Sequence, residues 1–233
     1  MTKKSKDSDW QEELEKPLTE EIIENEPVKA VAKADYDSTD RVKHGVVLTG
    51  GIDSTVMLCQ LKNTLPKDAE IIPITIGSRP KELTGILNEL KVMTQVKNFD
   101  IDDSDADESK MLPLIGWAIE NKIFVIHFAA NHDEAEQSIP NRNFDYFQRL
   151  NDLSEVNIST PFSTVTKEKI IQDAVDLYGL DLSQLTKPLK GIRKDLDEKY
   201  AKIRKDGFAK AFSIKYQKWI EDPFAPEPEK KKE

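Results

Sequence analysis

The stretch His44–Leu58, "HGVVLTGGIDSTVML", decides how the fold is interpreted. An apolar run at Val46–Leu48 leads into two glycines, and Asp53-Ser54-Thr55 then opens a run with apolar residues at helical spacing. This pattern predicts a buried strand, a tight turn and a helix. In a parallel α/β sheet, such a turn lies beyond the carboxyl end of its strand, where ligands bind.

The alternation of apolar runs and amphipathic segments continues along the chain. Further strands are predicted at 69–77, 96–101, 123–129 and 156–162, and helices at 53–65, 80–94, 110–122, 144–154 and 164–179. Strands that alternate with helices at these lengths are typical of βαβ units. The sequence therefore predicts an α/β fold with a doubly wound, mainly parallel five-stranded sheet and a helical C-terminal extension.

Composition divides the chain into four parts. Residues 1–40 and 221–233 are rich in charge and poor in large apolar side chains, so we expect a disordered arm and a disordered tail. Between them, 41–181 is the predicted nucleotide-binding α/β domain and 182–220 the helical C-terminal region. Their combined length, roughly 180 residues, suits one ordinary domain.

Bulk properties exclude several classes of protein. A single cysteine, Cys59, excludes a disulfide framework or a multi-cysteine metal site. No long apolar run could span a membrane, so we expect a cytoplasmic protein. The net charge of −9 argues against a nucleic acid partner. The locally basic segment Lys187–Lys218 could meet phosphate or an acidic partner, but we interpret it as a solvated helix face.

The glycine turn has the residue types that cradle an anion. Glycines let backbone amides approach phosphate, hydroxyls donate to its oxygens, and the next helix begins with unpaired amides. Asp53 would repel phosphate unless a divalent cation lies between them or its carboxylate caps the helix. The alternative is an ordinary joint with Asp53 or Ser54 as N-cap. The predicted nucleotide-binding residues here are Thr49, Gly50, Gly51, Asp53, Ser54 and Thr55.

At this turn the sequence resembles a known family. "VVLTGGIDSTVML" resembles the PP-loop of the N-type ATP pyrophosphatases, which is usually Ser-Gly-Gly-x-Asp-Ser, with Thr49 in place of the serine. The resemblance implies that ATP is cleaved between its α and β phosphates, that an acceptor oxygen is adenylated, and that AMP is then displaced. It also implies Mg²⁺, held by Asp53 through the phosphates.

Other stretches resemble the 7-cyano-7-deazaguanine synthases of that group, roughly over 42–212. They are "IIPITIGSRPKEL", "STPFSTVTKEKIIQDAVDLYGLDL" and "RKDGF". The resemblance implies that Arg79 lies at the nucleotide and that Lys167 neutralises its phosphates, so Asp53 and Lys167 are the expected catalytic residues. From the residues alone, a lysine at a helix N-terminus opposes the helix dipole unless an anion is near. An exposed lysine is the alternative.

The family pattern breaks at its zinc site and on the acceptor side. The four zinc cysteines are replaced by Lys187, Asp195, Glu198 and Ala201, so no zinc is expected. The stretches "DDSDADESK" and "IPNRN" also depart from the family where it faces its deazapurine. The nucleotide pocket therefore looks retained, the acceptor pocket looks remodelled, and the acceptor remains open.

Two main hypotheses follow. The first is an ATP-dependent C–N ligase acting on a small-molecule acceptor, for which the resemblance implies a 7-deazaguanine acid, as in queuosine biosynthesis. The second is an inactive homologue repurposed as a binding or structural protein, with a protein partner for its charged arms. A thiolating PP-loop enzyme ranks lower because the chain has only Cys59. Family members often dimerise, so a homodimer is a further expectation.

Other candidate residues receive ordinary interpretations. We expect a solvated His44, a core His127 and a packed Cys59. His132-Asp133-Glu134 follows the fourth predicted strand at the ligand edge, where it could touch substrate or metal, but a polar loop is the favoured interpretation.

Overall fold

The computed structural model describes residues 41–77, 81–101, 108–186 and 194–225. The predicted arm at 1–40 and Arg79 lie outside these ranges, as does most of the tail at 221–233. Nothing in the structure tests the disorder expected for the arm and the tail.

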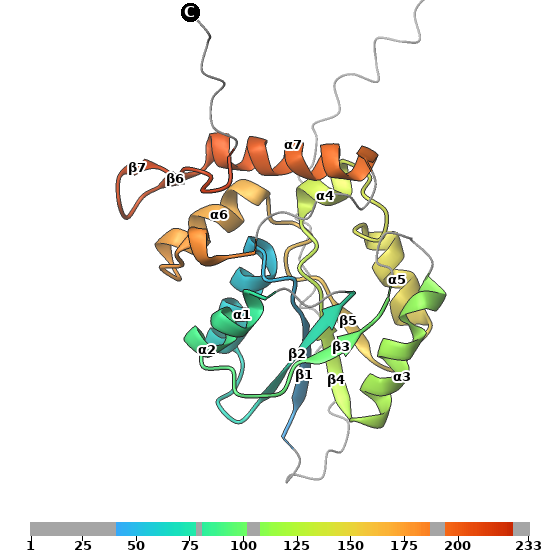
Figure 1. The fold of residues 1–233 in the computed structure, drawn as a ribbon. Helices are drawn as coiled ribbons and strands as arrows, with labels where there is room; N and C mark the ends of the chain where they lie inside the picture. The colour runs from blue at the N-terminus through green and yellow to red at the C-terminus, as the bar shows by residue number, and fades with distance from the viewer. Residues whose placement is uncertain (1–40, 78–80, 102–107, 187–193, 226–233) are drawn as a thin grey trace, which may run out of the picture. The chain divides into compact units, whose positions relative to one another are not determined.

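The five strands form one parallel sheet in the order β3-β2-β1-β4-β5 (Figure 1). The predicted fold class is therefore confirmed. The chain first builds outward from β1 through β2 to β3, and then returns to place β4 on the other side of β1. The reversal creates a crevice between the carboxyl ends of β1 and β4, which is where such sheets bind ligands. The strands are β1 (Lys43–Val47), β2 (Glu70–Ile76), β3 (Lys97–Phe99), β4 (Ile123–His127) and β5 (Asn157–Ser159).

Helices cover both faces of the sheet (Figure 1). One face carries α1 (Ile52–Thr64), α2 (Leu83–Glu89) and α6 (Lys167–Asp176), and the other carries α3 (Leu112–Glu120) and α5 (Phe144–Asp152). A 3₁₀ turn, η1 (Glu108–Met111), precedes α3, and the short helix α4 (His132–Glu136) follows β4.

Each face of the sheet has its own apolar core. Val46 of β1 belongs to the cluster with α1, α2 and α6, whereas the next residue, Val47, belongs to the cluster with α3 and α5. Because successive strand side chains point to opposite faces, the unbroken apolar run of β1 is buried on both sides. Cys59 of α1 is 5% exposed, which confirms its packing role, and burial raises the pKa of its thiol to about 11.

The C-terminal region contains η2 (Leu182–Gln184), α7 (Lys194–Lys210) and an antiparallel hairpin of β6 (Phe212–Ser213) and β7 (Lys218–Trp219). Helix α7 packs on α6 and also contacts α4 (Figure 1). Leu182, Phe208 and Ile220 share the core of α1 and α6, so this region completes that core. The sequence predicted the helix but not the hairpin, whose strands are too short to show an alternating pattern.

Two histidines contact each other from the neighbouring strands β1 and β4. His44 Nδ1 lies 3.1 Å from His127 Nε2, and the rings stack with their centroids 5.4 Å apart. The expectation of a solvated His44 is therefore wrong: its side chain packs on β4 and only 9% of the residue is exposed. Burial lowers the pKa of His44, and burial together with the neighbouring His44 lowers the pKa of His127 to about 4.

No helix within the described ranges combines the length and the apolar character needed to cross a bilayer.

Candidate functional site

The turn between β1 and α1 depends on a glycine in the left-handed region. Gly50 has φ +74°, and its carbonyl accepts a 2.9 Å hydrogen bond from the amide of Thr186. A Cβ at residue 50 would lie 2.2 Å from Thr186 Oγ1. Both the backbone angle and the close approach of Thr186 therefore require glycine here.

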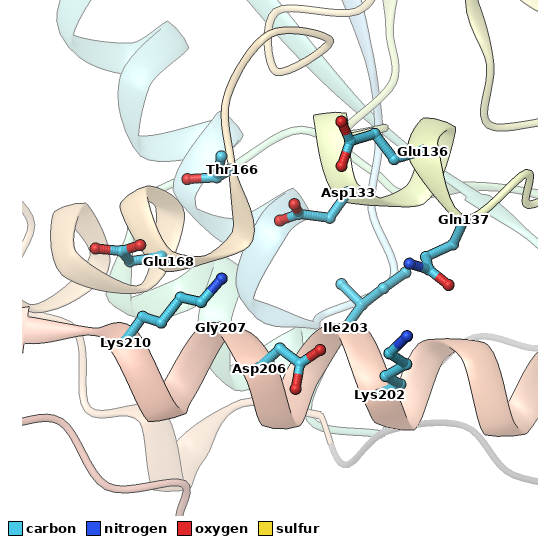
Figure 2. Close-up of a pocket in the computed structure, with 10 residues that line it drawn as sticks. All are labelled: Asp133, Glu136, Gln137, Thr166, Glu168, Lys202, Ile203, Asp206, Gly207 and Lys210. Carbon is cyan, nitrogen blue, oxygen red and sulfur yellow. The ribbon is translucent and has the colours of Figure 1, made fainter.

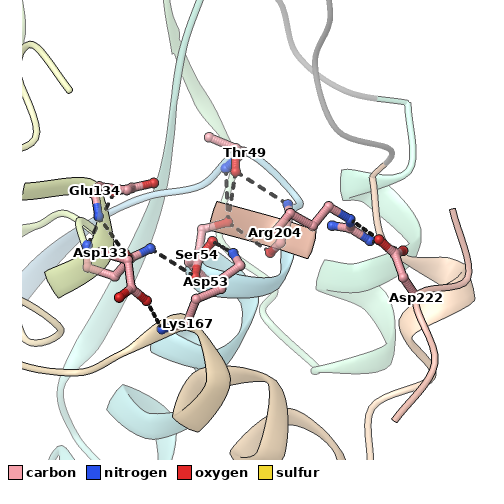
Figure 3. Close-up of polar contacts among 10 residues, drawn as sticks. Thr49, Asp53, Ser54, Asp133, Glu134, Lys167, Arg204 and Asp222 are labelled. Carbon is pink, nitrogen blue, oxygen red and sulfur yellow. Dashed lines mark hydrogen bonds and ion pairs between the residues drawn. The ribbon is translucent and has the colours of Figure 1, made fainter. Parts of the chain in front are cut away.

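Two hydroxyls hold the turn in shape (Figure 3). The Gly51 amide donates to Thr49 Oγ1 at 3.3 Å, the Thr49 and Ser54 hydroxyls lie 3.1 Å apart, and Ser54 Oγ donates to the Gly51 carbonyl at 3.3 Å. The Thr49 amide also donates to Ser54 Oγ at 3.2 Å. Because both hydroxyls close the turn on itself, their predicted role as phosphate donors stays a prediction.

The N-terminus of α1 has no side-chain cap. Its N-cap residue is Gly51, so the alternative in which Asp53 or Ser54 caps the helix is wrong. The first amides of a helix have no acceptor inside it and carry its positive dipole end. The Thr55 hydroxyl is buried there and has no hydrogen-bond partner among the described residues. The turn thus retains donors that an anion would satisfy.

Asp53 and Lys167 are brought together from opposite ends of the domain (Figure 3). Lys167 Nζ pairs with Asp53 Oδ2, and the two side chains are only 9% and 20% exposed. Lys167 is the first residue of α6, whose N-cap Thr166 accepts from the Lys169 amide. The alternative of an exposed Lys167 is therefore wrong. The anion that relieves its conflict with the helix dipole is, in this structure, Asp53.

The segment after β4 supports this ion pair. Asn131 caps α4 by accepting from the Glu134 amide at 3.0 Å, while Glu134 Oε2 accepts from the Asn131 amide at 3.2 Å. Asn131 Nδ2 then donates to Asp53 Oδ1 at 3.4 Å. The Lys167 amide donates to Asp133 Oδ2 at 2.5 Å. The favoured polar loop is therefore wrong for 132–134, since these residues begin α4, and Asp133 and Glu134 contact the site.

Sequence reasoning missed Asn131, although a signal was present. Asn-x-x-Glu ahead of a short helix is the pattern of a capping box, and it stands directly after the fourth strand at the ligand edge. A search for caps at the carboxyl ends of strands would have found it.

Glu134 is a buried acid close to this ion pair. Burial, and next the neighbouring Asp53 carboxylate, raise the pKa of Glu134 to about 7, while the charges of Arg142 and Lys167 oppose that rise. At neutral pH its carboxyl is therefore divided between protonated and ionised forms. The site thus holds a second carboxyl, Glu134, close to the ion pair of Asp53 and Lys167.

Helix α7 presses on the stem of Lys167. A Cβ on Gly207 would lie 2.6 Å from Lys167 Cγ and 3.0 Å from Lys167 Cβ. Gly207 belongs to the "RKDGF" stretch, and nearby Arg204 makes a bidentate pair with Asp222 at 2.6 Å for each bond. Glycine thus lets α7 cover Lys167 closely enough to exclude water from one side of it.

A polar pocket of about 220 Å³ lies between α4, α6 and α7, next to this contact (Figure 2). Asp133 and Gly207, which both touch Lys167, are part of its wall. The other lining residues are Glu136, Gln137, Thr166, Glu168, Lys202, Ile203, Asp206 and Lys210. Ile203 is the one apolar side chain in this set, so the pocket suits a small polar group rather than a flat ring.

Arg79 and Lys187 lie outside the described residues, so the structure does not place them. Asp195, Glu198 and Ala201, which stand where the resemblance has zinc cysteines, belong to α7. Within the described part of the chain, no group of three or more His, Cys, Asp or Glu side chains could hold a metal ion by itself.

Comparisons with known proteins give a limited result. No family model matches the chain, and no curated protein does. Among solved structures, the U34-tRNA thiolase NcsA from Methanococcus maripaludis, with its 4Fe–4S cluster, is 15% identical over 72% of this chain and 71% of that one, with a TM-score of 0.48. A predicted subunit of tRNA methyltransferase from Methanocaldococcus jannaschii is 15% identical over 77% of this chain and 96% of that one, with a TM-score of 0.42. Likeness at this level assigns neither a family nor an activity.

Proposed function

We propose that the chain binds ATP at the turn between β1 and α1 and transfers its adenylyl group to an oxygen of a small-molecule acceptor. The observation that carries the proposal is the meeting of Asp53 and Lys167 at the uncapped N-terminus of α1, beside the β1/β4 crevice. Asp53 offsets the charge of Lys167 at the N-terminus of α6, and the pair supplies the two charges that nucleotide phosphates and their metal require.

The turn fits the triphosphate of ATP. The α1 amides and the unpartnered Thr55 hydroxyl are donors in the first turns of α1, and the Lys167 ammonium is a donor that contacts Asp53 of the same helix. Phosphate oxygens would compete with Asp53 for Lys167. Lys167 is almost fully buried, so a phosphate that replaced Asp53 would be poorly screened by water and strongly held.

Asp53 fits Mg²⁺ that is held mainly by the nucleotide. Mg²⁺ commonly uses one or two carboxylates together with substrate phosphates, so a lone carboxylate beside a phosphate site suffices. When bound, the ion would offset negative charge on the phosphates and on Asp53. Asn131 donates to Asp53 Oδ1 at 3.4 Å, so the carboxylate is held between Asn131 and Lys167.

The reaction needs no protein nucleophile. A carboxylate or amide oxygen of the acceptor attacks the α phosphorus, the bond to the β-phosphate oxygen breaks, and pyrophosphate leaves with the negative charge. Lys167 and the α1 amides stabilise that charge as it develops. Ammonia or another amine then attacks the activated carbon of the acceptor and displaces AMP, which completes C–N ligation.

The acceptor is proposed to be a small carboxylic acid, with 7-carboxy-7-deazaguanine as the first candidate on sequence resemblance. The pocket between α4, α6 and α7 offers little apolar surface to a deazapurine ring. We therefore place the polar amine or ammonia nucleophile on that side, and the acceptor ring elsewhere in the β1/β4 crevice.

The test measures the products from α-labelled ATP with Mg²⁺, ammonium and 7-carboxy-7-deazaguanine. We expect AMP and pyrophosphate, formed only when the acid is present. Lys167→Ala should lower the rate of AMP formation by about 100-fold, because it removes a donor that acts on the leaving group. The matched control is Lys169→Ala, which removes an exposed lysine of the same helix that pairs with Asp173.

Three outcomes would contradict the proposal. ADP and phosphate as the products would show cleavage at the wrong bond. Equal rates for Lys167→Ala and Lys169→Ala would remove Lys167 from the reaction. Tight ATP binding, weakened by Lys167→Ala but without AMP formation for any carboxylic acid offered, would instead favour the repurposed binding protein.

A further inference from the structure

The β6–β7 hairpin presents large apolar side chains to solvent. Trp219 is 61% exposed, Tyr216 is 52% exposed and Ile214 is 71% exposed, and all three lie within six residues of one another. Scattered exposed apolar residues are ordinary, whereas several gathered on one small element mark a binding surface. The hairpin therefore needs an explanation that the nucleotide site does not supply.

The hairpin is held rigidly rather than left to fray. Asp176 at the end of α6 accepts from Ser213 Oγ at 2.5 Å and from the Ile214 amide at 2.9 Å. The Ser213 hydroxyl in turn accepts from the Tyr216 amide at 3.0 Å. At its base, the Ile220 amide donates to the Ala211 carbonyl at 3.0 Å. A backbone held in this way loses little conformational entropy when the hairpin binds a partner.

The charge of the hairpin differs from that of the whole chain. Residues 212–219, "FSIKYQKW", contain two lysines and no acid, in a chain whose net charge is −9, and the acids Glu221 and Asp222 follow the hairpin. Lys215 Nζ lies over one face of the Tyr216 ring, 5.2 Å from its centre, so positive charge sits at an exposed aromatic side chain. Asp176, the acid that holds the hairpin, is occupied by Ser213 and Ile214.

We propose that the β6–β7 hairpin binds single-stranded nucleic acid, with Trp219 and Tyr216 stacking on bases and Lys215 and Lys218 contacting phosphates. A single strand offers regularly spaced phosphates together with open base faces, which is the chemistry that basic and aromatic side chains recognise. A duplex hides its base faces by stacking, so it fits less well. This surface is separate from the proposed ATP site and does not depend on it.

Whole-chain charge does not exclude this interaction. At moderate salt, electrostatic repulsion between an acidic protein and a nucleic acid is screened beyond about 10 Å. The charges within that distance of the strand therefore contribute most to the interaction energy. On the hairpin itself the charged side chains are Lys215 and Lys218, while the Asp176 carboxylate at its base accepts from Ser213 and Ile214.

The test is fluorescence anisotropy of labelled oligo(U) of about 15 nucleotides with the full chain, across a series of salt concentrations. We expect binding that weakens as salt rises and exceeds binding to a duplex of equal length. Tyr216→Ala and Trp219→Ala should each weaken it by roughly 5- to 150-fold. Lys215→Gln with Lys218→Gln should lower the slope of log K against log salt by about 1.4, since each single-strand phosphate contact contributes about 0.7.

The matched controls are Phe144→Ala, which removes a 72% exposed ring of α5, and Lys91→Ala, which removes an exposed lysine outside the hairpin. Both should leave affinity unchanged. Trp219 packs edge-on against Phe212, so circular dichroism must show that its variant is folded, and Tyr216→Ala provides a test that leaves that contact intact.

The proposal is overturned if the intact chain does not bind oligo(U) at 50 mM salt, where two phosphate contacts with a combined slope of about 1.4 should make binding about 7-fold stronger than at 200 mM. It is also overturned if Phe144→Ala weakens binding as much as Tyr216→Ala does. Self-association that is lost in Tyr216→Ala, without any binding to oligo(U), would show that the surface serves a second copy of the chain instead.

Discussion

Replacing Gly207 by alanine tests how closely α7 covers Lys167. The new Cβ would lie 2.6 Å from Lys167 Cγ, 3.0 Å from Lys167 Cβ and 3.2 Å from Ile171 Cδ1. The first two atoms belong to the stem of a buried side chain, next to its backbone, so they cannot swing aside as a chain end would. Either α7 must separate from α6, or Lys167 must leave its place beside Asp53.

The magnitude follows from two opposing effects. Alanine in a helix interior is worth about 1 kcal/mol more than glycine. Overpacking of a tight contact costs about 1–3 kcal/mol, and two contacts at or below 3.0 Å put Gly207→Ala near the upper end of that range. We therefore expect a net loss of about 2 kcal/mol in the free energy of unfolding. ATP should also bind more weakly, because Lys167 is displaced.

The matched control is Gly116→Ala in α3. Nothing lies within 4 Å of a Cβ at that position, so the helix propensity gain stands alone and the variant should be about 1 kcal/mol more stable. Urea unfolding followed by circular dichroism measures both variants. A third measurement combines Lys167→Ala with Gly207→Ala. Because Lys167→Ala removes Cγ, the closest contact of the new Cβ disappears. The loss in the free energy of unfolding caused by Gly207→Ala should therefore be smaller by at least about 1 kcal/mol in the Lys167→Ala background.

The reasoning is refuted if Gly207→Ala stabilises the chain as Gly116→Ala does, since α7 would then not pack on the stem of Lys167. It is equally refuted if the cost of Gly207→Ala is unchanged in the Lys167→Ala background.

Three further substitutions test other parts of the structure. Gly50→Ala forces a φ of +74° on alanine and places its Cβ 2.2 Å from Thr186 Oγ1. The free energy of unfolding should therefore fall by at least about 2 kcal/mol, and isothermal titration calorimetry should detect no ATP binding. The pKa of His127 is about 4 in the folded chain and about 6.5 in the unfolded chain, so between these pH values only the unfolded chain binds a proton there. The free energy of unfolding should therefore fall by about 3 kcal/mol as the pH drops from about 6.5 to about 4. Thermal melts of His127→Gln should lack this pH-dependent loss. Arg204→Lys loses the bidentate geometry of the pair with Asp222, so urea unfolding should show a loss of roughly 1–2 kcal/mol, whereas an unchanged stability would mean that a single ammonium contact suffices.

Local patterns were sufficient to predict most of the regular elements. The apolar run of β1 and the helical spacing in α1 are visible in the sequence because a buried strand and an amphipathic helix impose different periods on apolar residues. The same reasoning missed α4, of five residues, and the β6–β7 hairpin, whose strands have two residues each. Elements that short contain fewer than two full periods, so no repeat of the apolar pattern distinguishes them from loops.

The histidine pair shows why burial is harder to predict than periodicity. His44 stands at the start of a strand, where a polar residue is ordinarily solvated. Its burial comes from β4, which lies beside β1 only after the chain has passed through two other strands. The residues around His44 in the sequence therefore do not predict its contact with β4.

The sequence by itself determined the α/β class and the glycine turn after the first strand, and its family resemblance singled out Asp53 and Lys167 as candidates for a phosphate site. The class and the turn depend on local chemistry: which side chains can be buried and where a backbone can turn. The tertiary structure alone decided the strand order, the pairing of Asp53 with Lys167, and the cover that Gly207 allows over that pair. These contacts join residues up to 114 positions apart, and only the packing of the whole sheet and its helices sets the distances between them.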